Sequence, residues 1–472
     1  MDNPRAHHVR VGAVIGALVI AGAVASSANA GRTNTQPDNA TATRQAASGT
    51  SASNRSDEWP ITECGTMDGK GCAPTTRRVD LERPTFSNPT NITNPLFPVE
   101  PDAAVVQLGT VDGKPFRSET TTLPRTDAVD WYGTRVEVVL SQYVAWLDGR
   151  IEEVALDRYA QADDGSVWYF GEDVIDYVDG VATLTEGTWL AGRDGPPAML
   201  MPARPKVGDV YRVENVIGIV FEELTVIEVD KTVDGPNGKV RGAIVVDELG
   251  VTGGHSTKTL APGYGEFITT NDSEIEAVAV AVPINAIDGG VPLEIRKVAT
   301  AAGGVLEYVR SDEWESARFA TDRIKSMYAR LVRTQQPPRV MERLSKAISA
   351  LDKAVTSERT LRAEARSVDI AEAAIDLHAR YLPNLDVQVA RFHVHVQRLR
   401  VLAAADDGGG VMGELASLEH IADRLRMDDD RVLAEVDEGL RAARDAVESG
   451  STAAAADHAI RAANDLRNLS FA

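Results

Sequence analysis

The stretch that decides the fold of the first half is residues 157–180, which read DRYAQADDGSVWYFGEDVIDYVDG. Its aromatic and apolar runs are separated by Asp164-Gly165 and followed by Asp179-Gly180. Asp-Gly pairs flanked by such runs are typical of tight β-hairpin turns. The segment therefore predicts two short antiparallel strands joined by a turn.

The same pattern extends over residues 84–310. Apolar and polar residues alternate with a period of two at 135–140, 218–229, 239–249 and 274–282. Residue pairs that contain glycine and favour turns separate these runs. The predicted strands do not alternate with helical segments, as they would in a parallel α/β fold. We expect an antiparallel β-meander that is strongly curved or closed around its core. The Pro- and Asn-rich residues 84–98 should enter as an extended strap over the sheet.

The hydrophobic period changes to about 3.6 residues near residue 311, which indicates amphipathic helices. Proline or glycine breaks near residues 337, 383, 408 and 450 divide this region into about seven helices with short connections. Residues 385–402 are apolar on two sides and should form a central helix. The predicted fold class is α+β multidomain: a curved antiparallel β-meander over 84–310, followed by an all-α antiparallel helical bundle over 311–472.

The N-terminus has the pattern of an export signal. Residues 1–30 contain a basic start, an apolar run at 11–24 and the small residues Ala28-Asn29-Ala30. The run is shorter than the roughly twenty residues of a membrane-spanning helix, although an uncleaved anchor is the alternative. Residues 31–57 are small and polar and should form a disordered tether. We expect a mature chain without a transmembrane segment, extracellular or associated with the cell wall.

Charge and cysteine content restrict the possible partners. The formal net charge is −21, and such an acidic surface repels nucleic acid and anionic lipid. Cys64 and Cys72, within the extended segment 58–83, bracket a short glycine-rich loop and should form a disulfide in an oxidising compartment. Two thiolates without a nearby histidine do not complete a zinc site. His393 and His395 point apart on a helix, so no metal site is predicted there.

Four segments occur in a characteristic order: DGSVWYFGED at 164–173, TWLAGRDG at 188–195, VGDVY at 207–211 and APGYG at 261–265. They resemble a family of uncharacterised secreted bacterial proteins. The sheets of that family are similar to the curved antiparallel sheets of lipoprotein-carrier-like domains. The resemblance covers roughly residues 86–282 and implies an architecture and an envelope location but no reaction. The sequence departs from the pattern at Lys258, where aromatic residues are expected before the Ala-Pro-Gly turn.

The candidate site is an acidic aromatic hairpin formed by Asp163, Asp164, Trp168, Glu172 and Asp173. Its four carboxylates could bind Ca²⁺ or perform acid–base chemistry. The alternative is that they are ordinary hairpin-turn and strand-end residues, and the spacing of an EF-hand is missing. No other cofactor is predicted.

The expected function is that of a secreted or envelope-associated, non-catalytic binding protein of unknown ligand. The curved sheet would contact a ligand or a cell-wall component, and the helical region a protein partner. Nucleophile elbows, Ser-x-x-Lys with its partners and zinc-protease motifs are missing from the sequence. The alternative is a secreted carboxylate-dependent hydrolase that acts on saccharide or cell-wall material through Asp163 and Glu172. That alternative requires a pocket beside Trp168 with two carboxyl groups about 5–10 Å apart.

Overall fold

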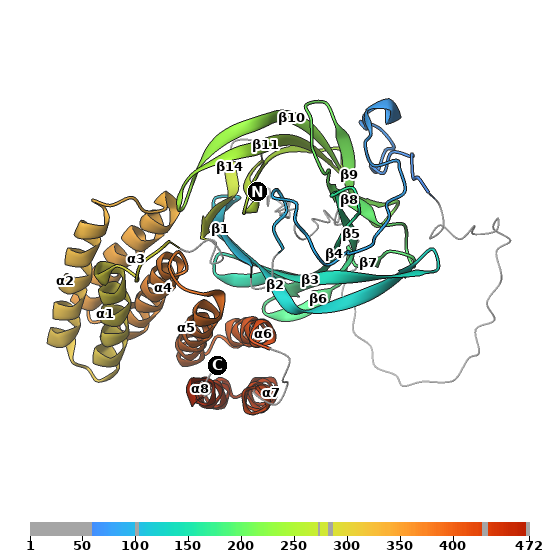
Figure 1. The fold of residues 1–472 in the computed structure, drawn as a ribbon. Coiled ribbons are helices and arrows are strands. Elements are labelled where there is room, and N and C mark those ends of the chain that lie inside the picture. Colours follow the sequence, from blue (N-terminus) through green and yellow to red (C-terminus); the bar gives the residue numbers. More distant parts are fainter. Residues whose placement is uncertain (1–58, 100–102, 272–273, 282–286, 427–432, 469–472) are drawn as a thin grey trace, which may run out of the picture.

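The computed structural model describes residues 59–99, 103–271, 274–281, 287–426 and 433–468. An antiparallel sheet of 14 strands is followed by eight helices in this part of the chain (Figure 1). The predicted fold class, a curved antiparallel sheet followed by helices, is confirmed. The predicted signal peptide (1–30) and tether (31–57) lie outside the described residues.

The strands follow one another as a meander, so that most pair with their neighbours in the chain. Their order in the sheet is β6-β5-β4-β3-β2-β1-β14-β13-β12-β11-β10-β9, and β7 and β8 pair with β5. Their bounds are β1 (Ala104–Val111), β2 (Lys114–Trp131), β3 (Thr134–Leu147), β4 (Arg150–Gln161), β5 (Val167–Val178), β6 (Val181–Leu184), β7 (Trp189–Leu190), β8 (Ala198–Met201), β9 (Val210–Val216), β10 (Val220–Gly235), β11 (Gly238–Gly250), β12 (His255–Ala261), β13 (Gly265–Asn271) and β14 (Glu274–Ala281).

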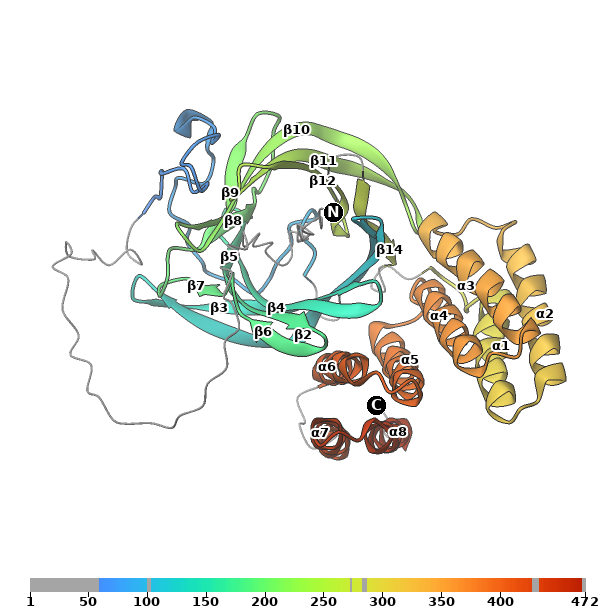
Figure 2. The same ribbon diagram turned by 180° about the vertical axis from the view of Figure 1, so that it is seen from behind.

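The sheet curls until its two ends meet. Strand β8 pairs with β5 near one end of the strand order and packs beside β9 at the other end. Figures 1 and 2 show β5, β8 and β9 side by side where the curved sheet returns on itself. The side chains on the inner face are thereby enclosed by the sheet.

Local turn chemistry explains the meander. Asp112, Asp148 and Asp179 each have a positive φ and are each followed by a glycine that also has a positive φ. This pair of left-handed conformations defines the turn whose twist suits a two-residue β-hairpin. The Asp-Gly pairs noted in the sequence therefore fix the connections β1–β2, β3–β4 and β5–β6.

Side chains from both faces of the sheet, together with the strap, form the main hydrophobic core. Trp168, Phe170 and Trp189 are buried there. The strap contributes Phe97, whose ring centroid lies 4.9 Å from that of Tyr159 in an edge-to-face contact. Before the strap, Cys64 and Cys72 form the predicted disulfide, with a Cα–Cα distance of 5.7 Å.

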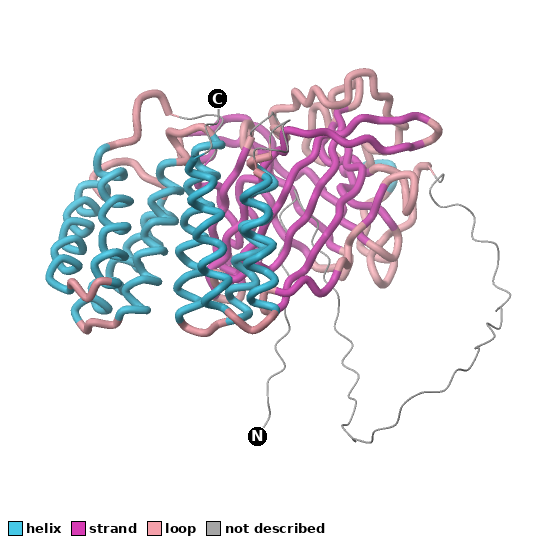
Figure 3. The backbone as a smooth tube through the Cα atoms, turned by 90° about the horizontal axis from the view of Figure 1, so that it is seen from below, coloured by secondary structure: helices cyan, strands magenta, loops and turns pink. Residues whose placement is uncertain are grey.

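The helices begin earlier than the sequence pattern suggested. Helix α1 starts at Leu293, within the range assigned to the β region, because its apolar residues already recur at helical spacing. The helices are α1 (Leu293–Arg310), α2 (Trp314–Leu331), α3 (Pro338–Thr356), α4 (Thr360–His378), α5 (Asn384–Ala404), α6 (Gly408–Arg424), α7 (Ala434–Glu448) and α8 (Thr452–Asn468). Figure 3 shows them side by side next to the strands. Among the described residues, no helix has the length and apolar character needed to cross a bilayer.

Helices α4, α5 and α6 face the sheet across a buried network of charges. Glu119 of β2 binds Arg117 at 2.6 Å and Arg424 of α6 at 2.6 Å, and it also pairs with Arg391 of α5. Asp376 of α4 accepts hydrogen bonds of 2.8 Å from both terminal nitrogens of Arg117. These five side chains are buried, so the sheet and the helices are joined by ion pairs that are shielded from water.

Candidate functional site

The structure separates the residues of the predicted acidic hairpin. Asp163 lies in the β4–β5 connection and accepts hydrogen bonds of 2.8 Å from the Thr85 hydroxyl and the Ser87 backbone N–H. These bonds lower its pKa, and they fasten the strap to the sheet. Asp164 accepts a hydrogen bond from the Ser166 backbone N–H at 2.9 Å, as in an Asx turn. Both aspartates therefore have structural partners.

The remaining members of the hairpin lie farther along β5. Glu172 points into the sheet, whereas Asp173 pairs on the outside with Arg158 at 2.6 Å. Asp164 lies in the turn before β5, whereas Glu172 is five positions beyond the first residue of β5, over which a strand covers about 17 Å. Trp168 is buried and donates its indole N–H to the Ser166 hydroxyl at 2.8 Å, so it offers no exposed ring. The four carboxylates thus do not form one cluster.

The strands are longer than the sequence pattern suggested, and this extra length keeps the four carboxylates apart. Strand β5 has 12 residues and continues through Glu172 and Asp173, which the sequence interpretation placed at a strand end. Within the described ranges, no group of three or more His, Cys, Asp or Glu side chains is arranged to hold a metal ion.

A different set of ionisable groups lies inside the curved sheet. It comprises six carboxyl groups and one lysine: Asp157, Glu172, Glu214, Glu222, Glu248, Glu266 and Lys258. Asp157 lies opposite Glu172 in the β4–β5 register and accepts a hydrogen bond of 2.6 Å from the Tyr169 hydroxyl. Lys258 pairs with Glu248 and lies 4.0 Å from carboxylate oxygens of Glu222 and Glu266. We call these seven residues the interior ionisable cluster.

Burial raises the pKa of Asp157 and Glu222 in this cluster. Burial and the neighbouring Glu172 raise the pKa of Asp157 well above its usual value. Burial, with a further contribution from Glu248, raises the pKa of Glu222 to about 8. Burial acts to lower the pKa of Lys258, but the surrounding glutamates outweigh it and raise the pKa. The inside of the sheet therefore combines a charged lysine with carboxyl groups, those of Asp157 and Glu222, that resist ionisation.

The sequence carried a signal for this cluster. Glu222 has the same period-two phase as Val220 and Leu224, which belong to the core of the sheet. Likewise, Lys258 lies two positions before the core residue Leu260. Charged residues in phase with a core face are candidates for burial, although the pattern alone does not show whether the sheet closes over them.

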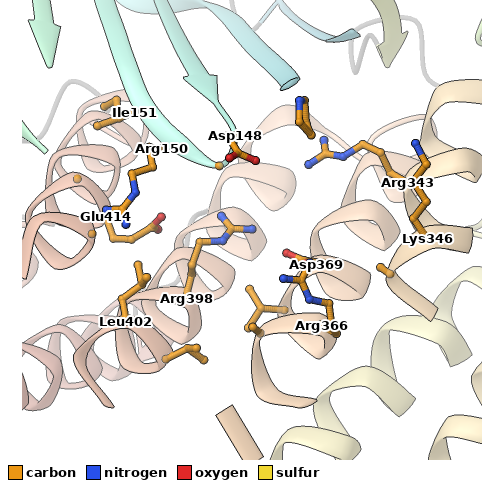
Figure 4. Close-up of a pocket in the computed structure, with 18 of the residues that line it drawn as sticks. Asp148, Arg150, Ile151, Arg343, Lys346, Arg366, Asp369, Arg398, Leu402 and Glu414 are labelled. Carbon is orange, nitrogen blue, oxygen red and sulfur yellow. The ribbon is translucent and has the colours of Figure 1, made fainter. Parts of the chain in front are cut away.

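A pocket of about 620 Å³ lies between the sheet and the helices (Figure 4). The β1–β2 and β3–β4 turns line it on the side of the sheet, and α3, α4, α5 and the start of α6 line it on the other. Six basic residues contribute to its walls: Arg150, Arg339, Arg343, Lys346, Arg366 and Arg398. Four acidic residues do so as well: Asp148, Glu342, Asp369 and Glu414.

Glu372 anchors the two central arginines of the pocket. It binds Arg343 of α3 at 3.0 Å and Arg398 of α5 at 3.1 Å. Burial acts to raise the pKa of Glu372, but the surrounding arginines, Arg398 foremost, outweigh it and lower the pKa well below its usual value. The carboxylate therefore stays charged and holds both guanidinium groups in place.

The pocket also has a substantial apolar wall. Leu108, Ile151 and Val368 line it and are buried, and Val401 and Leu402 of α5 complete this surface. The pocket thus combines fixed cations with apolar side chains, which is the usual composition of a small-molecule site.

A close contact between two glycine-containing segments positions one edge of the pocket. Gly180, in the β5–β6 turn, lies against the backbone of Gly409 and Gly413 at the start of α6. Its φ is +75°, and a Cβ atom at this position would overlap that backbone. Only glycine allows the turn to approach α6 this closely.

Comparisons with protein families, curated proteins and solved structures gave no match to this chain. The resemblance to the secreted bacterial family therefore stays an expectation based on its four motifs.

Proposed function

We propose that the protein is an exported, non-catalytic binding protein that holds a small ligand in the pocket between sheet and helices. The observation that carries this proposal is the pocket itself, whose volume of about 620 Å³ is within the range of small-molecule sites. Export is supported by the signal-like pattern of residues 1–30 and by the Cys64–Cys72 disulfide, which suits an oxidising compartment. The mature chain would act outside the cell or at the cell wall.

The geometry favours binding over the hydrolase alternative. That alternative required Asp163 and Glu172 to flank one site beside an accessible Trp168. Asp163 instead fastens the strap, and Glu172 and Trp168 are buried within the sheet. The pocket between sheet and helices supplies fixed charges and an apolar surface, which are sufficient for binding.

Native mass spectrometry of the mature protein, purified from its native host, tests the proposal. The wild type should carry a non-protein mass. Ala350→Trp should remove it, because Ala350 lines the pocket on α3 and a large side chain would fill the space. Ala404→Trp is the matched control, since Ala404 is exposed at the end of α5.

Circular dichroism should show that both variants keep the fold of the wild type. The proposal fails if the wild type carries no extra mass, or if Ala350→Trp retains the mass while remaining folded.

A further inference from the structure

The pocket concentrates positive charge on an otherwise acidic protein. The whole chain has 49 basic and 70 acidic residues. The walls of the pocket reverse this ratio, with six arginine or lysine residues and four acidic ones. A locally positive, partly apolar cavity attracts anions even when the protein as a whole is negative, because screening limits the reach of distant surface charges.

Two arginines are directed at the same space. Figure 4 shows Arg343 and Arg398 extending their guanidinium groups toward the middle of the pocket from opposite sides. Arg343 binds Glu372 through Nη2, and its Nη1 is buried without a hydrogen-bond partner in the described part of the chain. Since a guanidinium carries five N–H donors, both side chains retain capacity to bind a ligand.

The surroundings add basic side chains and a helix N-terminus at the edge of the pocket. Arg366 of α4 and Lys346 of α3 line it and pair there with Asp369 and Glu342. Helix α6 begins at Gly408 and its N-terminal glycines line the pocket, where the Asp407 carboxylate caps the helix by accepting a hydrogen bond from the Gly410 backbone N–H. Buried Glu372 keeps the two central arginines ordered, which reduces the entropy lost on binding.

We propose that the pocket binds a soluble small molecule that carries a phosphate group on an apolar body. The phosphate would lie between Arg343 and Arg398, and the apolar body against Val368, Val401 and Leu402. This inference rests on the proposed binding function and specifies its ligand class. Phosphate suits the site because its oxygens accept paired guanidinium hydrogen bonds from more than one arginine.

Isothermal titration calorimetry with simple probes tests the ligand class. Octyl phosphate should bind more tightly than inorganic phosphate, because the alkyl chain covers the apolar wall, and octanol should not bind. Equal binding of octyl phosphate and octanol would overturn the claim that the pocket selects a negatively charged ligand. Equal binding of octyl phosphate and octanoate would overturn the assignment to phosphate. Equal binding of octyl phosphate and inorganic phosphate would overturn the assignment of an apolar body to the ligand.

Variants test the location. Arg343→Gln and Arg398→Gln should each weaken octyl phosphate binding at least about tenfold, which corresponds to about 1.4 kcal/mol. Arg366→Gln, at the exposed rim, should weaken it less. Arg318→Gln is the matched control, because Arg318 and Arg366 are each 48% exposed and ion-paired, but Arg318 lies outside the pocket lining.

Arg366→Gln also covers the case in which a central variant does not fold, since its side chain is exposed. Unchanged affinity in Arg366→Gln and in every folded central variant would refute the proposed location. Flotation with phosphatidylglycerol vesicles should leave the protein in solution, and co-flotation would overturn the assignment to a soluble ligand.

The two proposals fail in different ways. A native mass that Ala350→Trp removes, together with no binding of octyl phosphate, would leave the binding function intact and refute only the phosphate assignment.

Discussion

Replacement of Glu222 by glutamine should make the protein more stable at alkaline pH. Glu222 is 4% exposed inside the curved sheet, and burial and Glu248 raise the pKa of its carboxyl group to about 8 from an ordinary value of 4.5. A carboxyl group with a raised pKa in the folded state resists ionisation there, whereas it ionises freely in the unfolded chain. The contribution of this protonated group to the free energy of unfolding is therefore fully present below pH 4.5 and is lost as the pH rises toward 8.

The magnitude follows from the two pKa values. A difference of one pH unit corresponds to 1.36 kcal/mol, so this group lowers the free energy of unfolding by about 5 kcal/mol between pH 4.5 and 8. Glutamine resembles the protonated acid in shape and removes the titration. Glu222→Gln should be close to the wild type at pH 5 and more stable by roughly 3–5 kcal/mol at pH 8. Lys258 keeps its pairing with Glu248 in this variant.

Urea unfolding at pH 5, 6, 7 and 8, followed by tryptophan fluorescence, measures the effect. Glu228→Gln is the control, because Glu228 is also on β10 but its side chain is 50% exposed, so no pH-dependent gain is expected. The reasoning is refuted if the stability difference between Glu222→Gln and the wild type is the same at pH 5 and pH 8.

Three further changes test other parts of the structure. Glu119→Gln should lower the free energy of unfolding, measured in urea at pH 7, by about 3–5 kcal/mol, because it leaves buried arginines without their full counter-charge. Glu358→Gln, which removes one partner of an exposed ion pair, should lower it by at most about 1 kcal/mol. Gly180→Ala should cost about 2–4 kcal/mol through its positive φ and its overlap with α6. Gly133→Ala, which shares the positive φ but has open space around it, should lower stability less than Gly180→Ala when the two variants are compared by thermal melts. Intact-mass analysis should find that the exported chain starts at Gly31, and a membrane-bound species that retains residues 1–30 would contradict this.

The meander could be predicted because its signals are local. A turn such as Asp148-Gly149 needs two positive φ values, and the dipeptide that supplies them is visible in the sequence. Helices were also recognisable from their period, and α5 extends over Asn384–Ala404 as the doubly apolar segment suggested. The sequence pattern places the change of period near residue 311, whereas α1 spans Leu293–Arg310 and has already ended there.

The interior ionisable cluster could not be predicted in the same way. Whether Glu222 or Lys258 is buried depends on the curvature of the sheet and on closure at β8 and β9, which are set by contacts between distant segments. The predicted acidic hairpin failed for a related reason. Glu172 and Asp173 are adjacent in sequence, but alternation along a strand sends one inward and the other outward.

The pocket depends on long-range packing even more strongly. Arg339, Arg343 and Lys346 recur at helical spacing on α3, and in sequence such a stripe is typical of a solvent-exposed face. These α3 residues line a pocket only because α4 and α5 place Glu372 and Arg398 next to them.

Helix α4 connects the pocket with the interface between sheet and helices. Glu372 and Asp376 lie one turn apart on this helix; the first holds the pocket arginines, and the second binds Arg117 of β2. Arg117 also acts on Glu372 and contributes to its lowered pKa. A ligand that binds only when the sheet and the helices are packed together must stabilise that packing, by about 2.7 kcal/mol at a concentration one hundred times its dissociation constant. Binding at the proposed site would therefore be thermodynamically linked to the association of the two halves.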